Sequence, residues 1–121
     1  PDHLGALCNR GILRAARGDC SQALDDFNRA VELEPRSYQA HCNRGNLFAQ
    51  MERHEDAIED FNRAIALRQD VAYLYCNRGV SYYKLGYDEH ALVDLEKSAE
   101  MGSELAEKFV REFFPDSRIL E

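Results

Sequence analysis

The sequence has little that would suit a membrane or a nucleic acid. It contains no long uninterrupted run of apolar residues, so we expect no membrane-spanning helix and no membrane partner. Basic residues are in the minority, because 15 Lys and Arg stand against 22 Asp and Glu and the net charge at pH 7 is −7. Nucleic-acid-binding domains usually carry a basic patch or a high pI. A nucleic acid is therefore not an expected partner.

The sequence also lacks the usual signs of a secreted protein. It has no Asn-x-Ser/Thr acceptor for N-linked sugars and only four cysteines. An even number of cysteines in a secreted chain would suggest disulfides. Here, however, Cys8, Cys42 and Cys76 recur at one interval, which indicates a structural position in a repeat. We expect a reducing, cytoplasmic environment.

An internal repeat is the strongest feature that is present. The tetrapeptide Cys-Asn-Arg-Gly occurs at residues 8–11, 42–45 and 76–79, with an interval of 34 residues each time. Other residue types keep the same register further along each copy. They are Ala23, Ala57 and Ala91, then Phe27, Phe61 and Leu95, then Ala30, Ala64 and Ser98. A period of this length indicates one supersecondary unit per copy.

Hydrophobic spacing predicts a helix in the second half of each copy. Ala23, Phe27, Ala30 and Val31 fall at i, i+4, i+7 and i+8, which is one stripe of a helix. The first half of each copy carries a glycine within its own expected helix, at Gly11, Gly45 and Gly79. A glycine inside a helix costs about 1 kcal/mol relative to alanine. Three glycines in register therefore indicate that two helices approach closely at this position.

These residues resemble the tetratricopeptide repeat (TPR) family over residues 4 to about 103. The family pattern places a small residue in the first helix of each repeat, followed by Ala, a large residue and Ala in the second helix. The glycines and the Ala-Phe-Ala sets match it, whereas Pro35 alone matches the family's exit proline, since Gln69 and Ser103 stand at the equivalent positions. The resemblance implies an all-α fold, a right-handed α-solenoid of three helical hairpins with a C-terminal capping helix.

We expect a single TPR domain over residues 1–121. Its repeats are placed at about 4–37, 38–71 and 72–103, with a cap at about 104–114 and a tail at 115–121, of which residues 116–121 are expected to be loosely ordered. First helices are expected near 4–16, 38–50 and 72–84, and second helices near 21–33, 55–67 and 89–101. The capping helix places large apolar residues on one broad face, where they could cover the last repeat. These residues are Leu105, Phe109, Val110, Phe113 and Phe114.

In TPR proteins the first helices line a concave groove, so the resemblance implies that their side chains bind a partner peptide. Asparagine recurs there as a ladder, and an amide can donate and accept at once, which suits an extended peptide backbone. The predicted peptide-binding residues are Asn9, Asn43, Asn77, Cys42, Asn46, Val80 and Tyr83. The alternative interpretation is that Asn-Arg-Gly is frequent TPR consensus with no bound ligand.

The arginine after each ladder asparagine also has two interpretations. It could attract an acidic peptide, or it could pair with an aspartate that recurs at the same interval on the second helix. The pairs in question are Arg10 with Asp26, Arg44 with Asp60, and Arg78 with Asp94. We favour the intramolecular pairs.

The resemblance also provides a test for one class of ligand. TPR domains that hold heat-shock chaperone tails resemble one another in two Lys, two Asn and one Arg that bind a terminal carboxylate. The corresponding residues here are Cys8, Ile12, Asn43, Tyr73 and Asn77. Only Asn43 fits, and no cation remains to pair with the carboxylate. A partner of the chaperone C-terminal tail type is therefore not expected.

Nothing in the sequence suggests catalysis. It contains no phosphate-binding loop, no nucleophile elbow and no Ser/His/Asp arrangement. The cysteines lack the close pairs that zinc sites use. We expect no enzyme activity, no cofactor and no metal.

The expected function is therefore a protein–protein interaction module, an adaptor that binds an extended segment of a partner in its groove. The alternative is a structural segment of a longer TPR superhelix, or a self-associating scaffold. Phe109, Phe113 and Phe114 distinguish the two. If these rings pack back on the third repeat, a closed monomer is favoured. If they project outward, self-association is favoured.

Overall fold

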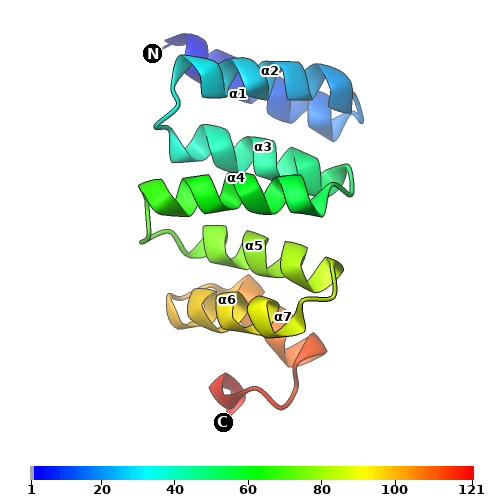
Figure 1. Cartoon of the computed structure of the whole chain (residues 1–121), viewed down its shortest axis with the longest axis vertical. Helices are drawn as coiled ribbons and strands as arrows, with labels where there is room; N and C mark the ends of the chain where they lie inside the picture. The colour runs from blue at the N-terminus through cyan, green and yellow to red at the C-terminus, as the bar shows by residue number, and fades with distance from the viewer. Residues whose placement is uncertain (1) are drawn as a thin grey trace. The chain divides into compact units, whose positions relative to one another are not determined.

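The computed structural model describes residues 2–121, and over this range all the regular secondary structure is helical (Figure 1). No strand occurs between residues 2 and 121, so the predicted all-α TPR fold class is confirmed. The helices are α1 (Asp2–Ala16), α2 (Cys20–Leu33), α3 (Tyr38–Gln50), α4 (His54–Leu67), α5 (Ala72–Lys84), α6 (Asp88–Glu100) and α7 (Glu104–Phe113), followed by the short 3-10 helix η1 (Arg118–Leu120).

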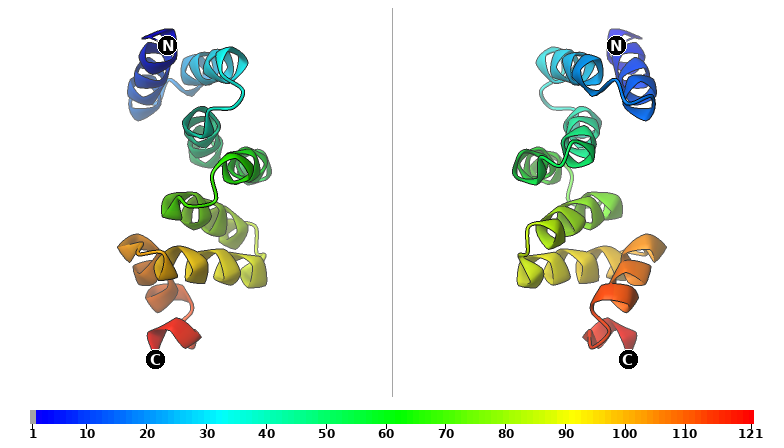
Figure 2. Two further views of the ribbon diagram at one scale, coloured as in Figure 1. Left: turned by 90° about the vertical axis from the view of Figure 1, so that its left-hand side faces the viewer. Right: turned by 90° about the vertical axis from the view of Figure 1, so that its right-hand side faces the viewer.

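The helices form two compact units. The N-terminal unit ends at Arg68 and holds α1 to α4, in which α1 packs on α2, α2 on α3 and α3 on α4. The C-terminal unit, Gln69–Glu121, holds α5, α6, α7 and η1, with α6 packed against both α5 and α7. Within each unit, consecutive helices run as hairpins joined by short turns, as the side views in Figure 2 show.

The turn within each hairpin requires one residue in the left-handed region. Gly18 and Gly86 both have φ of +85°, a conformation that costs glycine little because it has no Cβ. Glu52 holds the equivalent place in the second hairpin, with φ of +62°. All three helix breaks lie where the repeat register predicts them. The N-terminus of α7 is capped by Ser103, whose side chain accepts a hydrogen bond from the Ala106 amide at 3.1 Å.

The recurring glycines lie where two helices of a hairpin touch. A Cβ atom added at Gly45 would lie 2.8 Å from Cε1 of Phe61, and one at Gly79 would lie 2.9 Å from Cγ of Leu95. Gly11 stands in the same relation to Phe27, at 2.6 Å. Since real side chains do not approach so closely, only glycine allows the second helix to bring its large residue against the first. The predicted packing reason for these glycines is confirmed.

The core of each hairpin is the small–large–small set of its second helix. Every member is buried, with at most 2% of its surface exposed. The set comprises Ala23, Phe27 and Ala30, then Ala57, Phe61 and Ala64, then Ala91, Leu95 and Ser98. Ser98 can replace alanine because its hydroxyl donates a 2.7 Å hydrogen bond to the carbonyl of Ala72 in the same unit.

The tail at 115–121 differs from the expectation of a loosely ordered end. Ile119 and Leu120 are half-buried against the apolar cluster of the C-terminal unit, and Ser117 is buried. The segment is too short to show a periodic hydrophobic pattern, so the sequence does not predict this packing.

Phe61→Ala should be among the most destabilising single substitutions. Phe61 is 1% exposed and fills the space that Gly45 leaves, so its removal creates a cavity that typically costs about 3–5 kcal/mol. Urea denaturation followed by circular dichroism measures this loss. Phe113→Ala is the matched control, because Phe113 is 41% exposed and should lose much less. An unchanged midpoint for Phe61→Ala would show that the register is wrong.

Candidate functional site

Each repeat has a bidentate ion pair between its first and second helices. Two guanidinium nitrogens donate to the two oxygens of one carboxylate, at distances between 2.7 and 3.1 Å. The pairs are Arg10–Asp26, Arg44–Asp60 and Arg78–Asp94. The predicted intramolecular pairing is confirmed, and these arginines are directed at their own second helices.

The carboxylates of these pairs are almost completely buried. Asp26 is 3% exposed and accepts a further hydrogen bond from Arg14 at 2.9 Å. The hydrogen bonds from Arg10 hold the pKa of Asp26 below its usual value, against the opposing effect of burial, and the charges of Arg10 and Arg14 act in the same direction as the hydrogen bonds. Arg10 and Asp26 therefore both stay charged, and their ion pair joins the two helices of the hairpin. In the second repeat, the hydrogen bond to Asp60 raises the pKa of Arg44.

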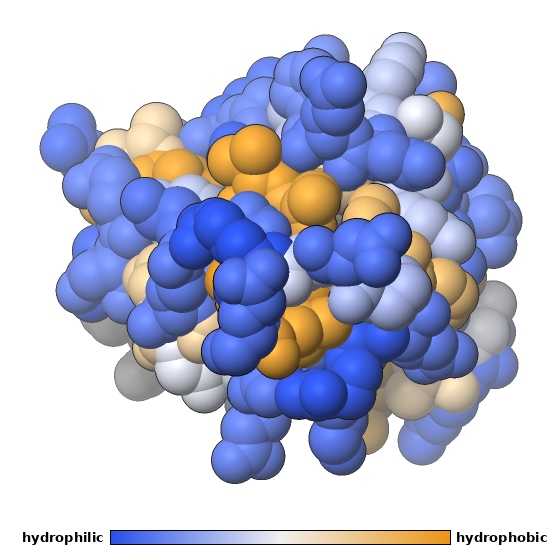
Figure 3. Space-filling view, turned by 90° about the horizontal axis from the view of Figure 1, so that it is seen from below, coloured by the Kyte–Doolittle hydropathy of each residue, from blue (hydrophilic) through white to orange (hydrophobic). Residues whose placement is uncertain are grey.

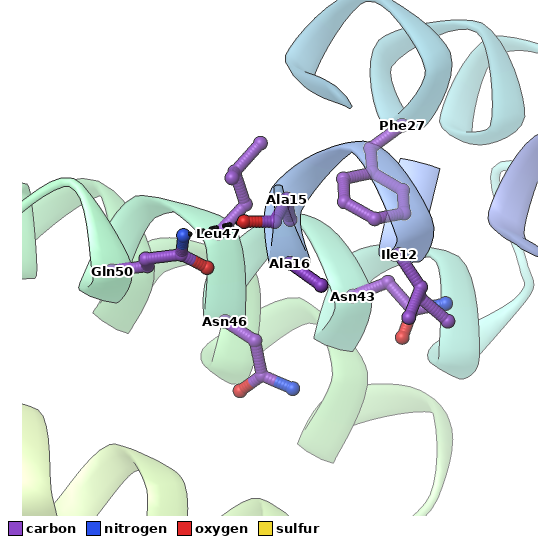
Figure 4. A pocket seen from close by; sticks show the side chains of 8 residues that line it. All are labelled: Ile12, Ala15, Ala16, Phe27, Asn43, Asn46, Leu47 and Gln50. Carbon is purple, nitrogen blue, oxygen red and sulfur yellow. Dashed lines mark hydrogen bonds between the residues drawn. The ribbon is translucent and has the colours of Figure 1, made fainter. Parts of the chain in front are cut away.

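The N-terminal unit has an open pocket of about 370 Å³ between α1 and α3 (Figure 4). No charged residue lines it: the walls are apolar, and three amide side chains stand among them. The lining residues are Ile12, Ala15, Ala16, Phe27, Asn43, Asn46, Leu47 and Gln50. Such a surface suits an uncharged side chain together with the polar backbone that carries it.

One amide of the pocket is held in place by a neighbouring helix. Gln50 Nε2 donates a 2.8 Å hydrogen bond to the carbonyl of Ala15, which links α3 to α1. Because the nitrogen is engaged, the amide oxygen of Gln50 is turned away from Ala15, as Figure 4 shows. Asn43 lies seven residues before Gln50, about two turns of the helix, so the two amides share one face of α3.

The predicted site residues fall into two groups. Asn43 and Asn46 both line the pocket, and Asn9 is exposed on α1 but does not line it. Cys42 is only 3% exposed and belongs to the core, so the prediction that it offers apolar contact to a peptide does not agree with the structure. The helical register turns Cys42 inward while its neighbour Asn43 remains half-buried.

The remaining predicted residues, Asn77, Val80 and Tyr83, are half-buried in the C-terminal unit. A ladder that joins Asn9, Asn43 and Asn77 into one site stays a prediction, because its members lie in different units.

Sequence reasoning did not select Leu47 or Gln50 as site residues. Both were detectable, since Asn43, Asn46, Leu47 and Gln50 follow the i, i+3, i+4, i+7 spacing of a single helix face.

Tyr83 is surrounded by the aromatic residues of the capping helix. Its ring centroid lies 5.3 Å from that of Phe109, 5.0 Å from Phe113 and 5.7 Å from Phe114. These rings pack back on α5 within the C-terminal unit, which is the arrangement that favours a closed end over self-association. Phe113 and Leu105 nevertheless stay 41% and 68% exposed. Figure 3, viewed from below with respect to Figure 1, shows hydrophobic patches separated by hydrophilic residues.

The cysteines and other potential metal ligands form no reactive centre in the described part of the chain. No disulfide forms over residues 2–121, and no group of three or more His, Cys, Asp or Glu is arranged to hold a metal ion there. Burial raises the pKa of the Cys76 thiol, which keeps it protonated. None of the helices over residues 2–121 combines the length and apolar character needed to cross a bilayer. The cytoplasmic location stays a prediction.

Sequence comparison identifies the family. A family profile described as TPR repeat matches residues 11–52 and 45–86, and one described as tetratricopeptide repeat matches residues 72–101. The chain therefore belongs to the tetratricopeptide repeat family, as the repeat register predicted. A comparison with curated protein sequences finds no match.

Several solved structures share the fold. The first TPR of Spaghetti (RPAP3), bound to the HSP90 peptide SRMEEVD, is 22% identical, with a TM-score of 0.86 over 92% of this chain and 90% of that one. The second TPR domain of human RPAP3, in complex with the HSP70 peptide SGPTIEEVD, is 20% identical, with a TM-score of 0.83 over 91% and 93%. The Sgt2 TPR domain from Aspergillus fumigatus is 22% identical, with a TM-score of 0.85 over 93% and 76%. Fold and family together make this chain a protein-interaction module.

These structures correct one expectation from the sequence. The exclusion of a chaperone C-terminal tail as partner is wrong, because domains of the same fold hold HSP90 and HSP70 peptides that end in Glu-Glu-Val-Asp. The exclusion depended on five side chains that describe one way to bind a carboxylate. The absence of that one set does not exclude a peptide of this class, so the criterion was too narrow.

Asp26→Asn should make the stability of the protein less sensitive to acid. The folded state holds the Asp26 proton less tightly than the unfolded chain does, so the pair stabilises the fold above about pH 4. That contribution is lost as the pH falls through the lowered pKa of the folded state. The wild type should therefore be more stable than the variant at pH 7, and the difference should shrink below about pH 4.

Thermal unfolding of both proteins across this pH range measures the effect. Asp25→Asn, at an exposed neighbouring position, removes the same charge but leaves the ion pair intact. A difference between wild type and Asp26→Asn that does not change with pH would contradict the prediction.

Proposed function

We propose that this protein binds an extended segment of a partner protein on the face of its first helices. The observation that carries the proposal is the uncharged pocket between α1 and α3, in which apolar walls and three amides are open to solvent. Apolar walls accept one side chain of the segment. The amides of Asn43, Asn46 and Gln50 bond its backbone, whatever the other side chains are.

The energetics suit a reversible interaction. Each hydrogen bond to the peptide backbone contributes about 0.5–1.5 kcal/mol net. Micromolar affinity corresponds to about −8 kcal/mol, so the three amides cannot supply it alone. Burial of an apolar side chain against Ile12, Ala15 and Leu47 supplies a further share. Asn9, which is exposed on α1 of the same unit, contacts the rest of the segment.

An acidic chaperone tail is the ligand class to test first. Two domains of the same fold hold such tails, and the first helices offer them little repulsion. Neither α3 nor α5 contains an Asp or a Glu, whereas α2, α4 and α6 carry many. A carboxylate-rich segment therefore meets the less acidic side of each hairpin.

The proposed activity is binding and not catalysis. The alternative of a self-associating scaffold receives less support, because Tyr83 and the three phenylalanines of the cap contact one another. Those rings are occupied within the C-terminal unit and are less available to another molecule.

Asn43→Ala should weaken binding of the peptide SRMEEVD by about 2- to 13-fold, which corresponds to the loss of one hydrogen bond. Isothermal titration calorimetry of the wild type and the variant measures this ratio. Gln22→Ala is the matched control, because it removes an exposed amide from α2, away from the pocket.

The same titration with a C-terminally amidated peptide tests whether the terminal carboxylate takes part. If Asn43→Ala binds as tightly as the wild type with its fold intact, the pocket is not the binding site. If neither peptide shows saturable binding, the ligand is not an acidic tail of this class.

A further inference from the structure

The C-terminal end of the chain lies against α6 as a strap, which comprises residues 115–121. Ser117 Oγ donates a 2.7 Å hydrogen bond to Glu96, and it also accepts one from the Ile119 amide at 3.3 Å. Arg118 extends along the same helix and bonds both oxygens of Glu100, at 3.1 and 3.3 Å, with Glu96 at 3.4 Å. The strap thus places a serine and an arginine on two acidic residues that are one helical turn apart.

The apolar end of the strap packs on the core of the C-terminal unit. Ile119 and Leu120 are half-buried against a cluster that includes Ala91, Ala106 and Val110. The segment therefore has the form of a bound peptide, with an arginine held by carboxylates and two aliphatic anchors on an apolar surface.

The strap covers this surface incompletely. A hollow of about 280 Å³ lies beside it at Leu92, Phe114 and Ser117. A second hollow of about 220 Å³ lies beside Ile119, with Ala99, Glu100 and Glu107 as its other walls. Larger side chains than those of the strap could be accommodated here.

The outer contact of the strap, between Arg118 and Glu100, is of a kind that is easily released. Arg118 is 62% exposed and its partner Glu100 is 53% exposed, so water and salt screen their attraction. Only seven residues are held, three of which form the short 3-10 helix η1, and no disulfide anchors them. Short segments with such contacts open locally without unfolding the domain.

We propose that the surface of α6 and α7 beneath the strap is a second docking site, for a partner segment that carries an arginine followed by aliphatic residues. The strap occupies this site in cis and competes with the partner. Glu96 and Glu100 select the arginine by charge, and the cluster around Val110 selects the aliphatic residues by burial. The site lies in the C-terminal unit, so it is separate from the pocket between α1 and α3.

A labelled peptide with the strap sequence Pro-Asp-Ser-Arg-Ile-Leu-Glu tests the proposal in the full chain. Ile119→Asp combined with Leu120→Asp loosens the strap and leaves α6 and α7 unchanged. A tethered strap competes at an effective concentration in the millimolar range. The loosened protein should therefore bind the peptide at least about ten-fold more tightly than the wild type does, as measured by fluorescence anisotropy.

Glu96→Gln in the loosened protein should weaken binding of the strap peptide by about five-fold or more, because a charged hydrogen-bond partner is removed. Glu112→Gln is the matched control, since this exposed residue of α7 has no contact with the strap that would require its charge. Neither change should alter binding of SRMEEVD, which separates this site from the proposed groove.

Hydrogen exchange in the wild type provides an independent measurement. The amides of Leu120 and Glu121 should exchange faster than those in the middle of α6. Exchange as slow as that of α6, or absence of peptide binding to the folded, loosened protein, would overturn the proposal. Equal binding to the Glu96→Gln and Glu112→Gln proteins would do the same.

Discussion

The close approach of two helices at a glycine is the constraint on which the rest of each hairpin depends. With no Cβ at Gly45, Phe61 packs directly on the backbone of α3, and the same relation recurs between Gly11 and Phe27. At Gly79 the large residue is Leu95. An alanine at any of these positions would push the helices apart. Separating the helices would also move the arginine and the aspartate beside the glycine away from each other. The ion pairs therefore depend on the same close contact.

The ion pairs in turn decide which side chains are available to a ligand. Each arginine next to the glycine is directed at a buried carboxylate on its own second helix, and Arg44 also donates to Asn28 Oδ1 of α2 at 3.1 Å. The amides of α3 that line the pocket, Asn43, Asn46 and Gln50, are uncharged. Under the proposed function, such a surface would bind backbone and apolar side chains first, and charge would act only through the absence of acidic residues on α3 and α5.

Repetition explains why much of this could be predicted from the sequence. The helix boundaries, the glycine contact and the arginine–aspartate pair recur in all three repeats at the same positions. Three agreeing copies predict the helices more firmly than a single motif does. Cys42 and Asn43 show the limit of that reasoning, because adjacent residues of one helix differ in exposure and the repeat alone does not say which faces inward. The exclusion of chaperone tails was wrong for a related reason, because it was based on five individual side chains and not on the shape of the fold.

The sequence by itself determined the fold class, the order of the helices and the pairing within each hairpin, because these depend on local spacing and on contacts that repeat. Tertiary structure alone decided the pocket between α1 and α3, which needs Gln50 to reach Ala15 across two helices. It also decided the strap, in which Ser117 and Arg118 meet Glu96 and Glu100. Such contacts occur once and join residues far apart in the chain, so no periodicity in the sequence records them.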